Sequence, residues 1–204
     1  MTLSLTAMAS GPLILASASP RRSRLLAQIG VPHEVRPVDL DETRRNGELP
    51  ADYVRRLARE KATAAARAAG AAERAVLAAD TAVVLGAQVF GKPADANDAV
   101  AMLMALGGRT HEVLTGVALL AGGRSSEAQS VSRVSFRPLD EADCRRYWAT
   151  GEPAGKAGAY AIQGLGAVFV TQVEGSYSGV MGLPLFETAA LLAGAGITCW
   201  QKPA

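Results

Sequence analysis

The stretch that decides the fold is Leu-Ile-Leu-Ala-Ser-Ala-Ser-Pro-Arg-Arg, at residues 13–22. Its first four residues predict a short buried strand, because a brief apolar run bounded by a turn signal is typical of a strand. Ser19 suits the N-cap of a helix, and Pro20 fits the first helical position, where its missing N–H costs nothing. We therefore expect a strand, a hydroxyl-rich turn and a helix that continues through Leu25 and Leu26.

Arg21 and Arg22 fall on the first turn of that expected helix. Two cations are unfavourable beside the positive end of a helix unless an anion lies between them and the backbone N–H groups. The turn, the helix N-terminus and the two guanidinium groups together indicate a receptor of the size of a phosphate. A solvated basic first turn is the alternative, and this segment alone does not separate the two.

The composition indicates one globular domain of ordinary charge. The chain has 204 residues, 49% hydrophobic content and a formal net charge of +2. Such a small charge does not suggest a general nucleic-acid binder. We expect Cys144 and Cys199 to be reduced thiols. The sequence contains only two histidines, which are too few, with these cysteines, to favour a structural zinc site. The sequence shows no signal-peptide pattern and no apolar run near the roughly 20 residues of a spanning helix, so we expect a cytoplasmic protein.

Helical and strand patterns alternate along the chain, which predicts an α/β fold with a mostly central sheet. Beyond the opening strand and helix, the expected helices are 52–69, 95–106, 140–149 and 185–192, and the expected strands are 32–38, 75–79, 82–85, 88–90, 112–121, 125–136 and 167–173.

Asp80 is the strongest catalytic candidate. The apolar run 75–79 predicts a strand that ends at Asp80, and ligands collect beyond the carboxyl ends of strands in open α/β sheets. A carboxylate there can bind a hard cation or accept a proton from water; the alternative is a turn or capping aspartate. Mg²⁺ typically binds one or two carboxylates in proteins, and Glu42, in the acidic run 39–42, would be the second beside Asp80. The alternative is a solvated surface loop, which is more common for such acidic runs.

Two lysines and a glutamine complete the candidates. Lys61 lies on the apolar face of its expected helix, where an amine either snorkels to the edge or points into a charged site. Lys92 follows Gly91, and a glycine lets the backbone approach a ligand closely. Gln163 lies in the glycine-rich stretch 158–164, and its amide can pair with the edge of a planar base; the alternative is a purely structural loop. With the arginines and carboxylates, these residues suit phosphoryl chemistry at a metal.

The phosphate-binding loop of kinases, the dinucleotide fingerprint and the serine-hydrolase elbow are absent from the sequence. Other short motifs occur in order along the chain: Leu-Ala-Ser-Ala-Ser-Pro-Arg-Arg (15–22), Asp-x-Asp-Glu (39–42), Arg-Glu-Lys-Ala (59–62), Ala-Asp-Thr (79–81), Gly-Lys-Pro (91–93), Gly-Arg-Thr-His-Glu-Val (108–113), Thr-Gly (115–116), Lys-Ala-Gly-Ala-Tyr-Ala-Ile-Gln-Gly (156–164), Glu-Gly-Ser-Tyr (174–177) and Val-Met-Gly-Leu-Pro (180–184). By these motifs the chain, from about residue 13 to residue 192, resembles the Maf family of nucleoside triphosphate pyrophosphatases.

The resemblance implies a mixed, mostly central β-sheet flanked by helices, with two lobes and a cleft as in inosine triphosphatases, and usually a homodimer. It implies a single catalytic domain over 13–194, between tails at 1–12 and 195–204. The implied reaction converts a nucleoside triphosphate to the monophosphate and pyrophosphate with Mg²⁺ or Mn²⁺. We accordingly assign Asp80, Lys61 and Lys92 to catalysis, Glu42 and Asp80 to the metal, and Ser17, Arg21, Arg22, Thr81 and Gln163 to the substrate.

The chain is similar to the branch of the family that acts on dTTP and UTP, because it has the residues of that branch at Arg21, Thr81 and Gln163. Ala161 replaces a more usual glycine and would stiffen its loop, because glycine tolerates backbone conformations that alanine does not. Two alternatives remain open: a nucleotide-binding regulator of cell division with little catalysis, and the same reaction on 7-methyl-GTP or another nucleotide. The expected partners are the nucleotide and a second copy of the chain, with no nucleic acid and no membrane.

Overall fold

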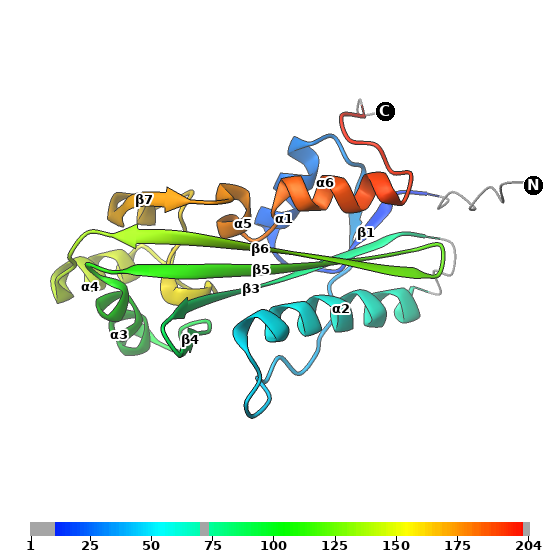
Figure 1. The fold of residues 1–204 in the computed structure, drawn as a ribbon. Coiled ribbons are helices and arrows are strands. Elements are labelled where there is room, and N and C mark those ends of the chain that lie inside the picture. Colours follow the sequence, from blue (N-terminus) through cyan, green and yellow to red (C-terminus); the bar gives the residue numbers. More distant parts are fainter. Residues whose placement is uncertain (1–10, 70–73, 202–204) are drawn as a thin grey trace, which may run out of the picture. The chain divides into compact units, whose positions relative to one another are not determined.

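A mixed β-sheet with flanking helices is the framework of the chain (Figure 1). The structure is a computed structural model that describes residues 11–69 and 74–201. The strands are β1 (Leu13–Leu15), β2 (His33–Val35), β3 (Val76–Leu85), β4 (Gln88–Phe90), β5 (Thr110–Ala121), β6 (Arg124–Phe136) and β7 (Val170–Glu174). The α-helices are α1 (Pro20–Gln28), α2 (Pro50–Ala68), α3 (Ala96–Leu106), α4 (Glu141–Ala149), α5 (Tyr177–Met181) and α6 (Leu185–Gly194), and two 3₁₀ turns are η1 (Ala157–Ala159) and η2 (Leu165–Phe169).

The order of the strands is β2-β1-β3-β5-β6-β7, and β4 pairs with β3 off this path. Strand β1 is parallel to both β2 and β3, with Leu15 opposite Val35 on one side and Leu77 on the other. The pairs β3–β4 and β6–β7 are antiparallel. The expected mixed sheet flanked by helices is therefore confirmed.

The chain forms two compact units. The first unit comprises the described parts of Met1–Asp80, Gly116–Gln129 and Gly182–Ala204, and the second comprises Thr81–Thr115 and Ser130–Met181. Strands β3, β5 and β6 contribute residues to both units.

Small side chains bring helix α2 close to the strands of the first unit. Ala58, Ala62 and Ala65 recur at helical spacing. They pack with Ile14 of β1, Ala16 just after it, Val76 and Ala78 of β3, and Ala118 of β5. A Cβ added to Gly116 on β5 would lie 2.6 Å from the carbonyl oxygen of Val54 on α2. Such close approach of backbones requires the smallest residues at the contact, and it fixes the helix that carries Lys61.

Aromatic and aliphatic side chains fill the second unit. Its core joins Val83 and Phe90 with the apolar faces of α3 and α4 and with the segment around Tyr160. Phe136 packs edge-on against both Tyr160 and His111, with ring centroids 4.8 and 4.9 Å apart. Edge-to-face pairs at these separations are favourable, so the segment that leads to Gln163 starts from a rigid core.

Several expected element boundaries are wrong, and the largest error concerns Asp80. The strand does not end there: β3 runs through Asp80 to Leu85, so 75–79 and 82–85 belong to one strand. Helix α2 begins at Pro50 and not at Asp52. Ser19 occupies the N-cap of α1 as expected, but its side chain makes no capping hydrogen bond.

The domain assignment stays a prediction: one catalytic domain over 13–194, with tails at 1–12 and 195–204. Within these tails, residues 1–10 and 202–204 lie outside the described part of the chain. In the described part of the second tail, the Trp200 N–H donates to the carbonyl of Ile29 at 2.6 Å, and the Gln201 N–H donates to that of Gly30 at 3.1 Å. None of the helices within 11–69 and 74–201 is long and apolar enough to cross a bilayer.

Candidate active site

Lys61 joins the two carboxylates that the sequence singled out. Its Nζ lies 2.6 Å from Asp80 Oδ1 and 2.6 Å from Glu42 Oε1. Helix α2 supplies the lysine, β3 supplies Asp80, and the segment between β2 and α2 supplies Glu42. Lys61 and Asp80 are both 8% exposed. Two carboxylates thus converge on one buried amine, and the snorkelling alternative for Lys61 is wrong.

The position of Asp80 follows from the unequal lengths of two parallel strands. The last paired residues are Leu15 of β1 and Leu77 of β3, and β3 continues past the end of β1 to reach Asp80. The carboxylate therefore lies beyond the carboxyl end of β1, where ligands of α/β sheets collect. Burial raises the pKa of Asp80 above its ordinary value, while the charges of Lys61 and Arg22 oppose that increase.

Ser17 organises the turn after β1. Its Oγ accepts hydrogen bonds from the Ser19 N–H at 3.2 Å and from Arg22 Nη1 at 3.1 Å. Arg22 Nε also donates to the carbonyl of Gly182 at 2.7 Å. Burial lowers the pKa of Arg22, and the nearby charge of Asp80 opposes that decrease. The hydroxyl of Ser17 thus ties Arg22 to the turn, near enough to Asp80 for the two charges to interact.

Arg21 lies beside Arg22 on the first turn of α1, as the sequence predicts. Its positive charge contributes to lowering the pKa of Arg22. The pair therefore concentrates positive charge at the N-terminus of α1, a position that favours bound anions.

Tyr53 is a site residue that the sequence reasoning missed. Its hydroxyl donates to the main-chain carbonyl of Glu42 at 2.9 Å. Burial raises the pKa of Tyr53 to about 12, and the charges of Asp80 and Glu42 contribute to that increase. No local pattern pointed to this contact, because Glu42 lies in a segment without helical or strand periodicity.

The other expected site residues belong to the second unit: Thr81, Lys92 and Gln163. Thr81 Oγ1 lies 2.9 Å from Thr115 Oγ1, which donates to the carbonyl of Gly179 at 2.8 Å. Lys92 is exposed between β4 and α3, and Gln163 is exposed between η1 and η2. The structure therefore groups Ser17, Arg21, Arg22, Glu42, Lys61 and Asp80 in the first unit, separately from these three.

Glu152 holds the segment that carries Gln163. Its Oε1 accepts from the Tyr147 hydroxyl at 2.6 Å and from the Gly166 N–H at 3.0 Å, and its Oε2 accepts from the Leu165 N–H at 3.0 Å. A Cβ on Gly164 would lie 2.0 Å from the Glu152 carboxylate. A side chain at position 164 would therefore displace the Glu152 carboxylate from these hydrogen bonds.

Ala161, the departure from the more usual glycine, fits its place. The non-glycine residues with positive φ in the described chain are Ala159 and Trp200, so the backbone at Ala161 is in a region that alanine adopts readily.

Comparison with known proteins identifies the relatives of this chain. The family described as Maf-like protein matches residues 12–195. The chain belongs to the Maf-like protein family. Among curated relatives of this Maf-like protein, the dTTP/UTP pyrophosphatase of Methylococcus capsulatus is 55% identical over 91% of each chain. The dTTP/UTP pyrophosphatase of Cereibacter sphaeroides is 53% identical over 94% of this chain and 99% of its own.

A third curated relative of this Maf-like protein is the dTTP/UTP pyrophosphatase of Hahella chejuensis, 52% identical over 93% of this chain and 94% of its own. Among solved structures, the Ham1 protein of Staphylococcus aureus matches with a TM-score of 0.41 and 14% identity, over 62% of this chain and 72% of that one. That structural similarity is too low to bear on the site.

Proposed function

We propose that this Maf-like protein hydrolyses dTTP and UTP to the monophosphate and pyrophosphate. The observation that carries the proposal is the buried ion triad Glu42–Lys61–Asp80, in which one amine contacts two carboxylates at 2.6 Å each. The names of the relatives, dTTP/UTP pyrophosphatase at 52 to 55% identity over nearly the whole chain, supply the reaction and the substrates.

The first unit binds the phosphates and activates water. Arg21 and Arg22 neutralise phosphate charge at the N-terminus of α1, where Ser17 holds Arg22 in place. Asp80 accepts the proton of the attacking water, because burial raises its pKa and so makes the carboxylate a stronger base than an exposed one. Lys61 places a positive charge between the carboxylates and stabilises negative charge that develops on the phosphoryl oxygens.

The donor set fits a divalent cation. The carboxylates of Glu42 and Asp80 meet at the same Nζ. The described residues contain no group of three or more His, Cys, Asp or Glu side chains that could hold a metal. Mg²⁺ is characteristically bound by one or two carboxylates, together with water and substrate phosphates. We therefore infer that Glu42 and Asp80 would hold Mg²⁺ or Mn²⁺ together with the nucleotide. When bound, such an ion would polarise a phosphoryl oxygen and neutralise charge.

The residues of the second unit complete the proposal. Lys92 adds positive charge for the triphosphate, Thr81 and Gln163 recognise the pyrimidine edge, and Glu152 fixes the backbone just after Gln163. The carboxamide of Gln163 offers one donor group and one acceptor, the combination that the edge of uracil or thymine requires. The homodimer, the cytoplasmic location and the absence of a nucleic-acid or membrane partner stay predictions.

The deciding experiment measures pyrophosphate release from dTTP, UTP, CTP, GTP and 7-methyl-GTP, each with Mg²⁺ and with Mn²⁺. Turnover concentrated on dTTP and UTP is the expected result. Turnover of 7-methyl-GTP above both would contradict the substrate assignment. Binding of nucleotides without any turnover would instead favour a nucleotide-binding regulator.

A further inference from the structure

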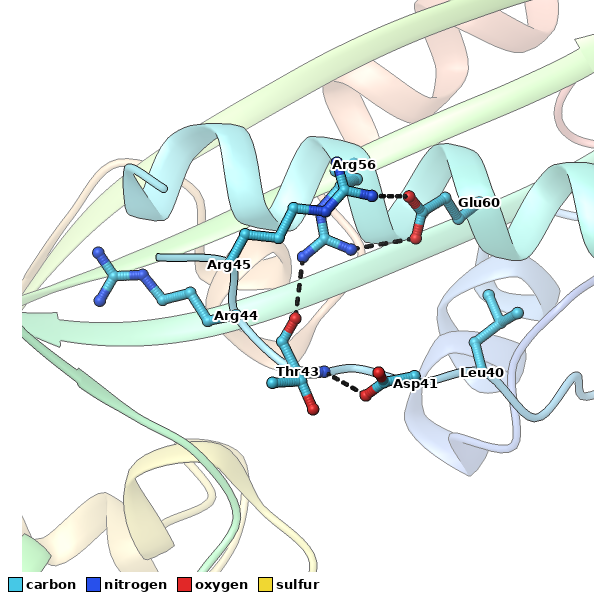
Figure 2. Close-up of a pocket in the computed structure, with 7 residues that line it drawn as sticks. All are labelled: Leu40, Asp41, Thr43, Arg44, Arg45, Arg56 and Glu60. Atoms are coloured by element: carbon cyan, nitrogen blue, oxygen red, sulfur yellow. Dashed lines mark hydrogen bonds and ion pairs between the residues drawn. The ribbon is translucent and has the colours of Figure 1, made fainter. Parts of the chain in front are cut away.

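The segment that carries Glu42 depends on side chains for its position. Residues 36–49, between β2 and α2, contain no helix or strand. A pocket of about 390 Å³ is lined by residues of this segment and of α2 (Figure 2), which are Leu40, Asp41, Thr43, Arg44, Arg45, Arg56 and Glu60. Because the segment has no helix or strand hydrogen bonds of its own, its position depends on side-chain contacts with the helix.

Among the side chains that join α2 to this segment, Arg56 contacts two points of it. Its Nε and Nη2 donate to the two carboxylate oxygens of Glu48 at 2.6 and 2.8 Å. Nη2 also donates to the carbonyl of Thr43 at 3.2 Å, and Nη1 donates to Glu60 on the same helix at 3.1 Å. Figure 2 shows Arg56 directed from α2 toward Thr43 and Glu60. One guanidinium thus contacts the residue directly after Glu42 and a second point farther along the segment.

This contact is buried and electrostatically strong. Arg56 is 7% exposed, and the guanidinium lowers the pKa of Glu48 to about 2. A planar guanidinium bound to both oxygens of a carboxylate fixes direction as well as distance. The phenol of Tyr53 adds a contact to the carbonyl of Glu42 at 2.9 Å, so the residue and its successor are both held from α2.

We propose that Arg56 is a positioning residue of the active site, which holds the segment 42–48 so that the Glu42 carboxylate stays at Lys61 Nζ. The inference rests on the proposed function, because Glu42 at that amine is part of the triad to which we assign the reaction. Arg56 acts through Glu42 and does not itself contact the substrate.

The test compares Arg56→Met with Arg55→Met. Arg55 is the adjacent residue of α2, is exposed, and pairs with Asp52 within its own helix, so it controls for loss of an arginine from this helix. Amide hydrogen exchange over 39–49 should rise in Arg56→Met and stay at the wild-type rate in Arg55→Met. The turnover number for dTTP should fall about 10- to 100-fold in Arg56→Met, the range for loss of a residue that orients a site ligand, with KM little changed.

A double variant separates positioning from a merely structural effect. In the background of Glu42→Gln, Arg56→Met should lower turnover by no more than about twofold, because residues that act through one another are not additive. Arg56→Lys, which keeps the charge and loses the fork, should retain an intermediate rate. If Arg56→Met proves too unstable, Glu48→Gln weakens the same contact more gently, and melting temperatures of all variants report that difference.

Two results would overturn the inference: unchanged exchange over 39–49 in Arg56→Met, or a full multiplicative loss of turnover in the double variant. If the wild-type protein hydrolyses no nucleotide, the proposed function fails, while the exchange measurement still decides whether Arg56 positions the segment.

Discussion

At the scale of single residues, the carboxylate that we propose as the general base lies where it is costly to ionise. Asp80 is buried, and its ionised form is supported by Lys61 at 2.6 Å and by the charge of Arg22. A base held in this way is reactive, since burial raises its pKa toward the working pH. Because Asp80 is buried, loss of the positive charge of Lys61 or Arg22 should make its carboxylate harder to ionise.

Asp80→Asn should bind dTTP and lose most turnover, by about 10² to 10⁴-fold, the usual contribution of a general base. The amide keeps the size of the side chain but cannot accept the proton of water. Pyrophosphate release gives the rate, and calorimetric titration of the variant with dTTP gives the affinity. Turnover within threefold of the wild type would remove Asp80 from the role of base.

His111 should give the protein a stability that depends on pH. It is 1% exposed, its Nε2 lies 2.9 Å from the Tyr160 hydroxyl, and burial lowers its pKa from 6.5 to about 4. Between those two values the unfolded chain binds a proton that the folded chain does not, so stability falls as the pH drops from 6.5 to 4 and levels off below.

Urea unfolding at several pH values between 7 and 3.5 checks this expectation. His111→Gln keeps an acceptor for Tyr160 but does not titrate, so it should lose the part of the decrease that lies between pH 6.5 and 4. An identical pH profile in the variant would show that His111 does not carry the effect.

At the scale of elements, the contact between α2 and β5 decides where Lys61 lies. Gly116→Ala would place a Cβ 2.6 Å from the carbonyl oxygen of Val54, a backbone atom that cannot rotate away. The helix must shift, which should cost about 1–3 kcal/mol of stability, as overpacking usually does. Turnover should fall as well, because the shift moves Lys61 relative to Asp80. Gly194→Ala, which meets nothing within 4 Å, is the matched control and should leave both quantities near wild type.

Sequence patterns predicted correctly those helices and strands whose ends are fixed by contacts between residues close in the chain. Asp95 and Asp140 cap α3 and α4, each accepting a backbone N–H three residues on, at 2.9 and 2.6 Å. The long pair 112–121 and 125–136 is confirmed as β5 and β6. Helix α5 was not predicted, because its five residues (Tyr177–Met181) are too few to show a helical period.

Asp80 shows where local reasoning fails. A charged residue after an apolar run is ordinarily a turn signal, yet here Lys61 neutralises the carboxylate from another element and the strand continues. The sequence named Glu42, Lys61 and Asp80 as candidates, but their convergence depends on contacts distant in the chain. Tyr53 and Arg56 were missed for the same reason, since their partners lie in a segment without periodicity.

At the scale of the whole molecule, the expected site residues are divided between two units that share strands. Asp80 is the last residue of the β3 segment in the first unit, and Thr81 is the first in the second. The phosphate-binding and carboxylate groups belong to the first unit, and the residues assigned to the base belong to the second. A nucleotide that binds the folded chain and not the unfolded one should raise its stability.

This expectation can be measured in Asp80→Asn, which binds substrate without consuming it. At a nucleotide concentration 100 times the dissociation constant, binding contributes about 2.7 kcal/mol. For a chain of 204 residues that corresponds to a rise in melting temperature of about 5–10 °C. We expect dTTP and UTP with Mg²⁺ to produce it, and GTP and 7-methyl-GTP at equal concentration to produce much less. When Gln163→Ala is added to Asp80→Asn, the larger rise in melting temperature with dTTP and UTP should shrink. The rise with pyrophosphate alone should stay the same, because pyrophosphate has no base. Equal shifts for all four nucleotides in Asp80→Asn would place the recognition of the base elsewhere than at Gln163 and Thr81.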